Sequence, residues 1–396
     1  MNEYDSQCIT RQMIDSGFES SDEIRRVDVI LFNTCSVREH AAQRFYTNLG
    51  ATLELKNRNP ELIVGVCGCV AEQEGNRLFD RFPWVKLVTG PGNIALVGDA
   101  IKRIVENKSR ILMTGFIGDV KEKCSDSPSF ALAKLSGGVT IARKNKDSAL
   151  VTIIRGCNNF CSYCVVPYLR GREQSRPMDE IIEEVRQVVR DGYKEIMLLG
   201  QNVCAYKDSR ASKSKNDFAK LLKEINEIEG IEKIKFMTSH PRDVNQELIE
   251  AVATLDKVCK EFHLPVQSGS DKILKAMHRG YTREYYINLI NKIRGKIRGV
   301  RVTTDIIVGF PDETEEDFNQ TLDLVKKIKF DDAFTFKYSD RPNTIALKLE
   351  NKISNDVKIE RLKQLMDAVK EAAGQKEATD DEVERRSRES KKACPV

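Results

Sequence analysis

Short apolar runs alternate with amphipathic stretches along the first part of the chain. The apolar runs lie at residues 27–33, 62–66 and 85–90, and a stretch with helical spacing follows each of them. Alternation of this kind is typical of a parallel sheet with helices on its faces. We therefore predict an N-terminal open parallel α/β sheet domain over residues 1–120.

The alternation stops in residues 121–147, where Ser, Gly and Lys are frequent, and this stretch is predicted to be a linker. It then restarts. Further strands are predicted at residues 149–156, 195–200, 233–238, 261–266, 301–310 and 332–339. Six parallel strands with right-handed crossovers curl into an incomplete barrel, because eight would close it. We predict a partial (β/α)6 barrel over residues 148–350, with active residues at the carboxyl ends of its strands.

Helical patterns lie between the predicted barrel strands and after them. One amphipathic helix is marked by five apolar residues at helical spacing: Ile181, Ile182, Val185, Val188 and Val189. Thr314 to Asp317 resembles a capping box at a helix start. In residues 351–396, "VKIERLKQLMDAVKEAA" predicts a helix, and the following "GQKEATDDEVERRSRESKKACPV" has no apolar periodicity. Such a segment buries too little apolar surface to fold, so a disordered tail is predicted.

The composition narrows the class of protein. The 396 residues carry 64 basic and 60 acidic side chains, and the net charge of +4 is compatible with an RNA partner without arguing for one. No N-terminal segment resembles a signal peptide, and no apolar run is long enough to span a bilayer. We expect a cytoplasmic protein with no membrane association. Its 11 cysteines are then more often core residues or metal ligands than disulfides.

Three cysteines stand together directly after the first predicted barrel strand. Cys157, Cys161 and Cys164 lie at spacings of four and three in "RGCNNFCSYCVVPYLRGRE". A structural zinc ion needs four protein ligands, and the candidates for a fourth in this region are Cys204 and Cys259. An iron–sulfur cube has four iron corners, so three cysteines can leave one iron open to an amino group and a carboxylate. The position after the first strand of a partial barrel favours the cube.

This loop resembles that of the radical S-adenosylmethionine enzymes, in which an aromatic residue precedes the last cysteine; Tyr163 occupies that place. Further segments resemble the methylthiotransferases of this superfamily. They are "MNEYDS", "NTCSVRE", "GCVAEQ", "LLGQNV", "TSHPRD", "HLPVQSGSDKILKAMHRGYTREYY", "TTDIIVGFPDETEEDF" and "FKYSDRPNT". Several long motifs in the right order are far more specific than one. Over residues 1–366 the chain is identified as a member of this family, most similar to the tRNA-2-methylthio-N6-dimethylallyladenosine synthases.

The resemblance implies S-adenosyl-L-methionine and two 4Fe–4S clusters as cofactors. The three barrel cysteines would hold one cluster. Cys35 and Cys69 match two ligands of the second cluster, in the N-terminal domain. Both stand just past predicted strands, where an open α/β sheet binds its ligands, although reduced cysteine also packs as a small apolar core residue.

The family's third ligand of the second cluster lies in Gly-Cys-Gln just before "MN", and this chain begins at that Met. We therefore expect that ligand and the preceding strand to be absent, together with the family's small C-terminal RNA-binding β-barrel. Cys8 falls in a helical pattern and does not replace the ligand. Cys67 would share a strand face with Cys69, as a substitute ligand or, more often, as a core residue.

The resemblance also implies binding residues. The candidates for contacts to adenosylmethionine are Tyr163, Gly200, Gln201, Ser268 and Gly269. For the turn residues among them, an ordinary strand–helix turn explains the sequence equally well. The candidates for substrate phosphate or ribose are Arg170, Arg172, Lys337 and Arg341, with Arg176 in the same stretch. His263 is either a pocket residue or a satisfied core histidine. Asp312 and Asn343 stand where the family commonly has glycine, and both tolerate positive φ.

The activity that the resemblance implies is radical methylthiolation of a tRNA anticodon loop. One adenosylmethionine methylates a sulfur at the N-terminal cluster. A second binds the open iron of the barrel cluster, and one electron from a donor such as flavodoxin or ferredoxin cleaves it to methionine and a 5′-deoxyadenosyl radical. The radical abstracts hydrogen from C2 of N6-isopentenyladenosine, where the methylthio group is added. An unpaired anticodon base suits RNA recognition, and a monomer is expected.

Three alternatives stay open. In the first, the substrate is threonylcarbamoyladenosine in tRNA, and in the second it is an aspartate of a ribosomal protein. In the third, the chain is an inactive remnant that holds one cluster. "NTCSVRE" and "SDRPNT" favour the isopentenyl branch, because the ribosomal-protein branch carries acidic residues at the positions of Arg341 and Pro342. With two matched ligands for the second cluster, the chain is expected to cleave adenosylmethionine and to transfer little methylthio group.

Overall fold

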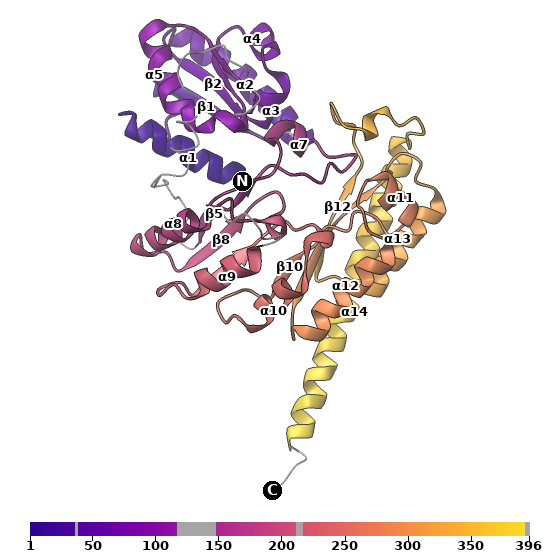
Figure 1. Ribbon diagram of the computed structural model, residues 1–396. Coiled ribbons are helices and arrows are strands. Elements are labelled where there is room, and N and C mark those ends of the chain that lie inside the picture. The colour runs from indigo at the N-terminus through magenta and orange to yellow at the C-terminus, as the bar shows by residue number, and fades with distance from the viewer. Residues whose placement is uncertain (36–38, 117–147, 211–216, 393–396) are drawn as a thin grey trace.

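The computed structural model describes residues 1–35, 39–116, 148–210 and 217–392. The predicted linker, residues 121–147, lies outside these ranges. The N-terminal domain contains one parallel sheet in the order β1-β2-β3-β4 (Figure 1). Its strands are β1 (Val29–Thr34), β2 (Ile63–Gly68), β3 (Val85–Thr89) and β4 (Ile111–Met113). The predicted open parallel α/β sheet is confirmed, and the three-residue β4 extends it by one strand that the sequence pattern did not indicate.

Helices cover both faces of this sheet. They are α1 (Asn2–Asp15), α2 (Glu39–Arg58), α3 (Cys69–Glu74), α4 (Arg77–Arg81) and α5 (Val97–Asn107), with short 3-10 helices at Ile24–Arg26 and Pro91–Leu96. Residues of α1 and α5 pack on one face, and residues of α2, α3 and α4 pack on the other. Every residue of β2 is buried as a result, which is why this strand is a continuous apolar run.

The second domain is a partial barrel of six parallel strands. They are β5 (Ala149–Thr152), β8 (Glu195–Leu199), β9 (Lys233–Phe236), β10 (Glu261–His263), β11 (Arg301–Val308) and β12 (Asp332–Lys337). β5, β8 and β9 form one group and β10, β11 and β12 another. The groups join ahead of β10, where Ile234 donates to the Lys257 carbonyl at 2.8 Å and accepts from the Cys259 amide at 2.9 Å. The predicted barrel is confirmed.

Helices pack on the outer face of the barrel strands. They are α8 (Met178–Arg190), α9 (Phe218–Asn226), α10 (Gln246–Thr254), α11 (Asp271–Ala276), α12 (Arg283–Lys296) and α13 (Glu315–Ile328). In α8 the predicted apolar positions face the core: Ile181, Val185 and Val188 are fully buried and Ile182 and Val189 partly. The predicted capping box of α13 is present, with both hydrogen bonds between Thr314 and Asp317.

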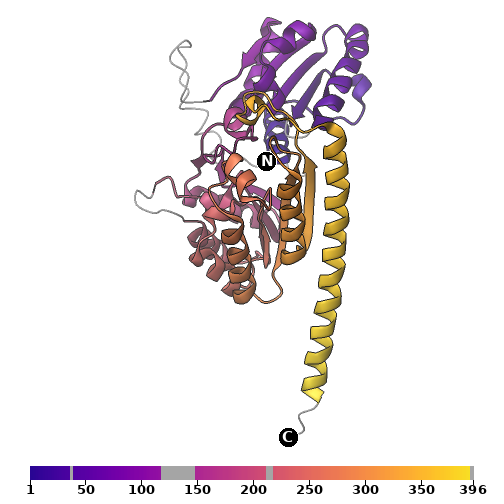
Figure 2. The ribbon, with the colours of Figure 1, turned by 90° about the vertical axis from the view of Figure 1, so that its right-hand side faces the viewer.

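The C-terminal helix α14 (Asn355–Lys392) packs against α13 and β12 and then projects past the barrel (Figure 2). Its backbone is helical to Lys392, beyond the helix that the sequence pattern indicated. Ala, Glu, Lys, Arg and Gln dominate this part of the sequence, and all have high intrinsic helix propensity. No helix in the described part of the chain combines the length and apolarity needed to cross a membrane.

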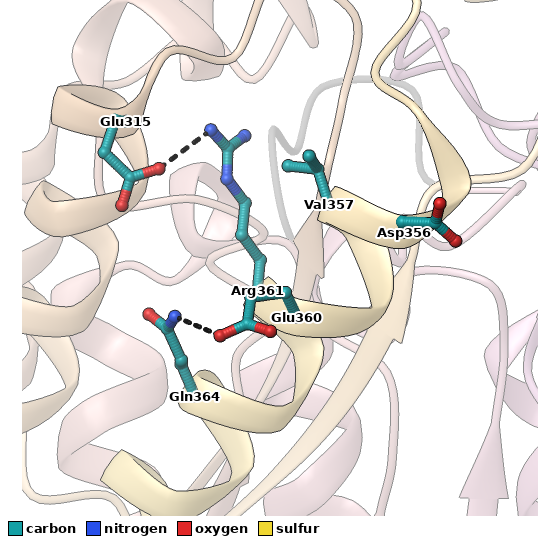
Figure 3. A pocket seen from close by; sticks show the side chains of 6 residues that line it. All are labelled: Glu315, Asp356, Val357, Glu360, Arg361 and Gln364. Atoms are coloured by element: carbon teal, nitrogen blue, oxygen red, sulfur yellow. Dashed lines mark hydrogen bonds and ion pairs between the residues drawn. The ribbon is translucent and has the colours of Figure 1, made fainter.

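A buried ion pair fastens α14 to the barrel. Arg361 donates to Glu313 at 2.8 Å and to Glu315 at 3.2 Å, and Glu313 also accepts from the Gly309 amide that follows β11. Figure 3 shows Arg361 reaching from α14 toward Glu315 across a pocket of about 420 Å³. The charge of Arg361 is thus neutralised within the fold, and the pocket contains no residue of the cysteine loop.

Replacing Arg361 by Met is expected to lower the free energy of unfolding by about 3–5 kcal/mol, because Glu313 would stay buried without its cation. Urea denaturation followed by circular dichroism measures this. Lys363→Met is the matched control, since it removes a positive charge from an exposed position of the same helix. Equal destabilisation by the two substitutions would show that the pair does not anchor α14.

Candidate functional site

The three-cysteine loop is closed at its base by a short antiparallel pair. β6 (Ile154–Arg155) pairs with β7 (Gln174–Ser175), and the loop between them includes the short helix α7 (Val166–Arg170). Gly156 has a φ of +73° and lies against the Arg172 carbonyl so closely that a Cβ would meet it at 2.1 Å. The Cys157 amide donates to the Gly171 carbonyl at 3.2 Å. The loop therefore starts and ends at one point of the barrel mouth.

Ser162 fixes the middle of the loop to the barrel. Its hydroxyl donates to the Ala276 carbonyl at 2.7 Å and its amide donates to the Met277 carbonyl at 3.1 Å, at the end of α11. Its own carbonyl accepts from the Ala346 amide at 2.8 Å. Phe160 holds a φ of +45°, a conformation that an aromatic residue adopts only when its surroundings impose it. The cysteines on either side of these residues are consequently held in place by backbone contacts.

The three thiols of this loop influence one another. The pKa of Cys164 is raised to about 12, chiefly by burial and also by the neighbouring Cys161 and Cys157. Burial, with a smaller contribution from Cys161, also raises the pKa of Cys157. Metal ligation requires thiolates, so loading this site must release protons. In the described ranges no group of three or more His, Cys, Asp or Glu side chains is arranged around a single metal ion. The cysteines of a cube bind separate irons and need not converge in this way.

Cys35 and Cys69 emerge side by side from the N-terminal sheet. Thr34, the last residue of β1, pairs in register with Gly68, the last residue of β2, so the next residue of each strand is a cysteine. The Thr34 hydroxyl donates to the Cys67 carbonyl at 2.7 Å and accepts from the Val70 amide at 3.2 Å. These two hydrogen bonds hold the ends of β1 and β2 together. The thiols are close enough for Cys35 to raise the pKa of Cys69, beyond the larger effect of burial.

The prediction that Cys67 and Cys69 share a strand face is wrong. Gly68 has a φ of +89°, which ends β2, and Cys69 is the first residue of α3. Cys67 instead points into the apolar core beside Cys8 of α1, and burial raises the pKa of each of these two thiols to about 12. Both pack as core residues, one of the two roles considered for Cys67.

The short helix α7 connects the two sets of thiols. α7 lies beside α3 (Figure 1), and Leu169 of α7 and Val165, just before the helix, form one buried cluster with Cys69. Arg170 donates to the buried carboxylate of Asp5 at 2.9 Å and also interacts with the Cys69 thiol. Arg155 of β6 donates to the same carboxylate at 3.3 Å. One buried acid of α1 thus binds both ends of the cysteine loop, and the loop lies against the N-terminal thiols.

Turn residues at the carboxyl ends of β8, β9 and β10 carry strain and unpartnered polar atoms. Thr238 and Gln267 have φ values of +73° and +75°. The buried side-chain atoms without a hydrogen-bond partner here include Gln201 Oε1, His240 Nε2 and Gln267 Oε1. Burial, followed by Arg279 and Arg242, lowers the pKa of His240 to about 2, so its imidazole is neutral. Acceptors and a neutral ring left without partners at a barrel mouth fit a polar ligand such as adenosylmethionine.

Comparisons with known proteins identify the family of this chain. A model described as Radical SAM superfamily matches residues 151–325, and one described as Uncharacterized protein family UPF0004 matches residues 1–90. The chain is 45% identical over 371 residues to the tRNA-2-methylthio-N(6)-dimethylallyladenosine synthase of Clostridium tetani, covering 93% of this chain and 78% of that protein. For the synthase of Carboxydothermus hydrogenoformans the identity is 46% over 370 residues, with 93% and 80% covered. The chain belongs to the tRNA-2-methylthio-N(6)-dimethylallyladenosine synthase family.

A solved structure has the same fold. TsrM from Kitasatospora setae, a radical S-adenosylmethionine methyltransferase with cobalamin and a [4Fe-4S] cluster bound, superposes with a TM-score of 0.63. The alignment covers 87% of this chain and 71% of TsrM at 15% identity, so it supports the fold alone.

In this synthase-family chain the turn residues predicted to contact adenosylmethionine lie at the barrel mouth. They differ in how closely they pack and in whether their polar atoms have partners. Gly200 and Gly269 pack closely: an added Cβ would meet Ile154 Cγ2 at 2.3 Å and the Gln320 carbonyl at 2.5 Å. The Ser268 hydroxyl is engaged with Thr321 and the Ser270 amide. Gln201 therefore has the freest polar atom of these four turn residues, and the fifth candidate, Tyr163, accepts from Arg279 at 3.4 Å.

The predicted substrate cations differ in exposure. Arg172 is exposed and lies over the Phe160 ring at 5.1 Å, and Lys337 is exposed and donates to Asn355 at 2.9 Å. Arg341 is half-buried and has a partner. Arg176 donates to Glu184 at 2.6 Å, so its charge is neutralised internally.

Several remaining candidates have local partners. His263 contacts Thr303 Oγ1 at 3.0 Å and Asp305 at 3.4 Å, which satisfies both ring nitrogens. Asp312 and Asn343 both have a φ of +65°, so both positions keep the turn that glycine usually makes. The two cysteines considered as a fourth zinc ligand lie elsewhere. Cys204 is buried in the barrel core, and Cys259 precedes β10, at the end of the strands opposite the cysteine loop.

Sequence reasoning did not single out Asp5, His240, Gln267 and Arg279. All four lie within quoted motifs, and the signal was a charged or polar residue inside an otherwise apolar motif. The role of Asp5 depends on partners far away in the chain, as its 165-residue separation from Arg170 shows.

Replacing Asp5 by Asn is expected to lower the free energy of unfolding by about 3–5 kcal/mol, because Arg170 would stay buried without its acid. Urea denaturation of the metal-free protein measures this loss. Asp15→Asn is the matched control on the same helix, where the pair with Arg11 is exposed and contributes about 0–1 kcal/mol. Amide hydrogen exchange in α7 should accelerate in the Asp5 variant alone. Unchanged exchange in α7 would contradict the role assigned to Asp5.

Proposed function

We propose that this chain methylthiolates C2 of N6-isopentenyladenosine next to the anticodon of tRNA by radical S-adenosylmethionine chemistry. The observation that carries the proposal is the placement of two thiol sets on either side of α7. Cys157, Cys161 and Cys164 lie at the barrel mouth, and Cys35 and Cys69 follow paired strand ends, with Cys69 packed against α7. A radical made at one set and a sulfur held at the other require such proximity.

In the proposed site the barrel cysteines hold a 4Fe–4S cluster, and Cys35 and Cys69 contribute to a second. When bound, the barrel cluster and adenosylmethionine supply the electron transfer and the adenosyl radical. Gln201 and Gln267 accept hydrogen bonds from the ligand through the buried oxygens that have no other partner. The neutral His240 donates through Nε2, because its Nδ1 accepts from the Arg242 amide.

An apolar surface inside the barrel suits the isopentenyl group. Phe334 and Phe336 pair in register with Asp305 and Ile307 of β11, on the face opposite the core residues Val302, Ile306 and Val308. Both rings are exposed, at 48% and 38%. Apolar rings left open to solvent on this face favour a substrate with an apolar substituent. This favours the isopentenylated base over threonylcarbamoyladenosine and over an aspartate.

The remaining parts of the proposal concern partners. The exposed Arg172 and Lys337 contact the phosphates of the tRNA anticodon loop. An external one-electron donor of the flavodoxin or ferredoxin type reduces the barrel cluster, and the chain acts as a monomer.

The test scores two products separately after anaerobic reconstitution and reduction with dithionite. The unsubstituted protein is expected to form 5′-deoxyadenosine. The Cys157/Cys161/Cys164→Ala variant should form none, and Cys35/Cys69→Ala should keep forming it. The proposed activity predicts methylthiolated nucleoside with isopentenylated tRNA and none from either variant, whereas the two matched ligands of the second cluster, taken from the sequence alone, predicted little transfer. Mass spectrometry measures both products, and Cys259→Ala is the control for removing a thiol outside the sites.

Two outcomes contradict the proposal. One is 5′-deoxyadenosine from the triple variant, which would place the radical chemistry elsewhere. The other is methylthiolation of tRNA carrying threonylcarbamoyladenosine with none of isopentenylated tRNA, which would move the substrate to the other branch. Iron and sulfide analysis adds the number of clusters, since two clusters bind about eight irons and one binds about four.

A further inference from the structure

Arg279 is buried beside the three-cysteine loop. It lies between α11 and α12, with 3% of its surface exposed. Its Nε donates to the Tyr281 hydroxyl at 3.0 Å and its Nη2 donates to the Pro265 carbonyl at 2.6 Å. Its Nη1 donates to the sulfur of Cys161 at 3.3 Å and to the Tyr163 hydroxyl at 3.4 Å. The guanidinium thus bridges the wall of the barrel and a cluster ligand.

The partners of Arg279 include no carboxylate, and this separates it from the chain's other buried arginines. Arg170 pairs with Asp5, and Arg361 pairs with Glu313. Across the described ranges, no acid lies within ion-pair distance of Arg279. A guanidinium stays protonated in proteins, and a buried charge without a counter-charge costs several kcal/mol. The position therefore calls for a negative charge at the Cys161 sulfur.

We propose that Arg279 is the counter-charge of the cluster held by Cys157, Cys161 and Cys164, and that it raises the reduction potential of this cluster. The inference rests on the proposed function, which places the cluster there. Each thiolate ligand contributes a negative charge, and reduction adds one more. A fixed cation at 3.3 Å from a ligand sulfur stabilises the reduced form more than the oxidised form.

Hydrogen bonding acts in the same direction. An N–H group directed at a cluster sulfur withdraws electron density from it, and such bonds are among the factors that set cluster potentials. The Tyr281 hydroxyl donates to the carbonyls of Pro265 and Val266, at 3.2 Å and 3.0 Å, and accepts from Arg279. This network fixes the guanidinium, so that the charge cannot move away to solvent. Arg279 thus acts through the cluster ligand and not on the substrate. By raising the reduction potential it lets a less strongly reducing donor reduce the cluster.

The test is an EPR-monitored redox titration of the reconstituted chain in a Cys35/Cys69→Ala background, so that the barrel cluster alone is observed. Adenosylmethionine and tRNA are left out. Arg279→Met is expected to make reduction at least about tenfold less favourable, which for one electron is a fall of about 59 mV. Arg279→Lys keeps the charge and should recover most of the potential. Arg172→Met removes an exposed charge of the same loop and should shift the potential far less.

A potential for Arg279→Met no lower than that of Arg172→Met would overturn the inference. If Arg279 instead binds only the carboxylate of adenosylmethionine, its replacement leaves the reduction potential measured without adenosylmethionine unchanged. That result would also overturn the inference. Should Arg279→Met fail to take up iron, Arg279→Gln removes the charge and keeps a donor toward Pro265, and the same criterion applies. Failure of the unsubstituted chain to assemble any barrel cluster would instead overturn the proposed function.

Stability gives a second readout that a merely structural role would not produce. The cation lacks a counter-charge in the metal-free chain and gains one with the cluster. Arg279→Met should therefore lower the melting temperature of the loaded protein more than that of the metal-free protein. Equal losses in both forms would contradict the counter-charge role.

Discussion

Asp5 is a carboxylate with no exposed surface that accepts from two arginines of the cysteine loop, Arg155 and Arg170. An ion pair in this setting is costly to break, because either partner alone would be a buried, unpaired charge. The ion pair therefore fixes the position of α1 against the barrel mouth. If α1 moved away, these charges would be exposed or would stay buried without partners. The packing of Val165 and Leu169 on Cys69 follows from that arrangement.

The same constraint explains why Cys69 lies against the cysteine loop of the barrel. Parallel strands end at one edge of their sheet, so Cys35 and Cys69 leave the N-terminal sheet together, and the three-cysteine loop leaves the barrel at its carboxyl edge. Joining the two edges through a five-residue helix sets the separation between the sites. Arg279 and Arg170 then place one cation on each side, toward Cys161 and toward Cys69. A cluster becomes more negative when it is reduced, so a cation beside a ligand sulfur favours its reduced form.

Much of this architecture follows from local patterns. Strand–helix alternation predicted the barrel strands and three strands of the N-terminal sheet, because buried parallel strands are continuous apolar runs. β4 was missed because three residues are too short for a pattern. The relation of Cys67 to Cys69 was wrong because one residue, Gly68, turns the chain by adopting positive φ. The motif spacing placed Cys157, Cys161 and Cys164 on one loop. The arginines that bind Asp5, and the contacts of Arg279 with Cys161 and Tyr163, come from segments more than 100 residues away, and no local pattern contains that information.

The central claim is that Cys157, Cys161 and Cys164 hold a 4Fe–4S cluster with one iron free for adenosylmethionine. The most direct measurement is the EPR spectrum of the dithionite-reduced chain in the Cys35/Cys69→Ala background, recorded before and after adenosylmethionine is added. The account predicts a reduced-cluster signal that changes on addition and that disappears when the three cysteines are also replaced by Ala. A signal that does not respond to adenosylmethionine, or tightly bound zinc in place of iron in the protein as isolated, would contradict it.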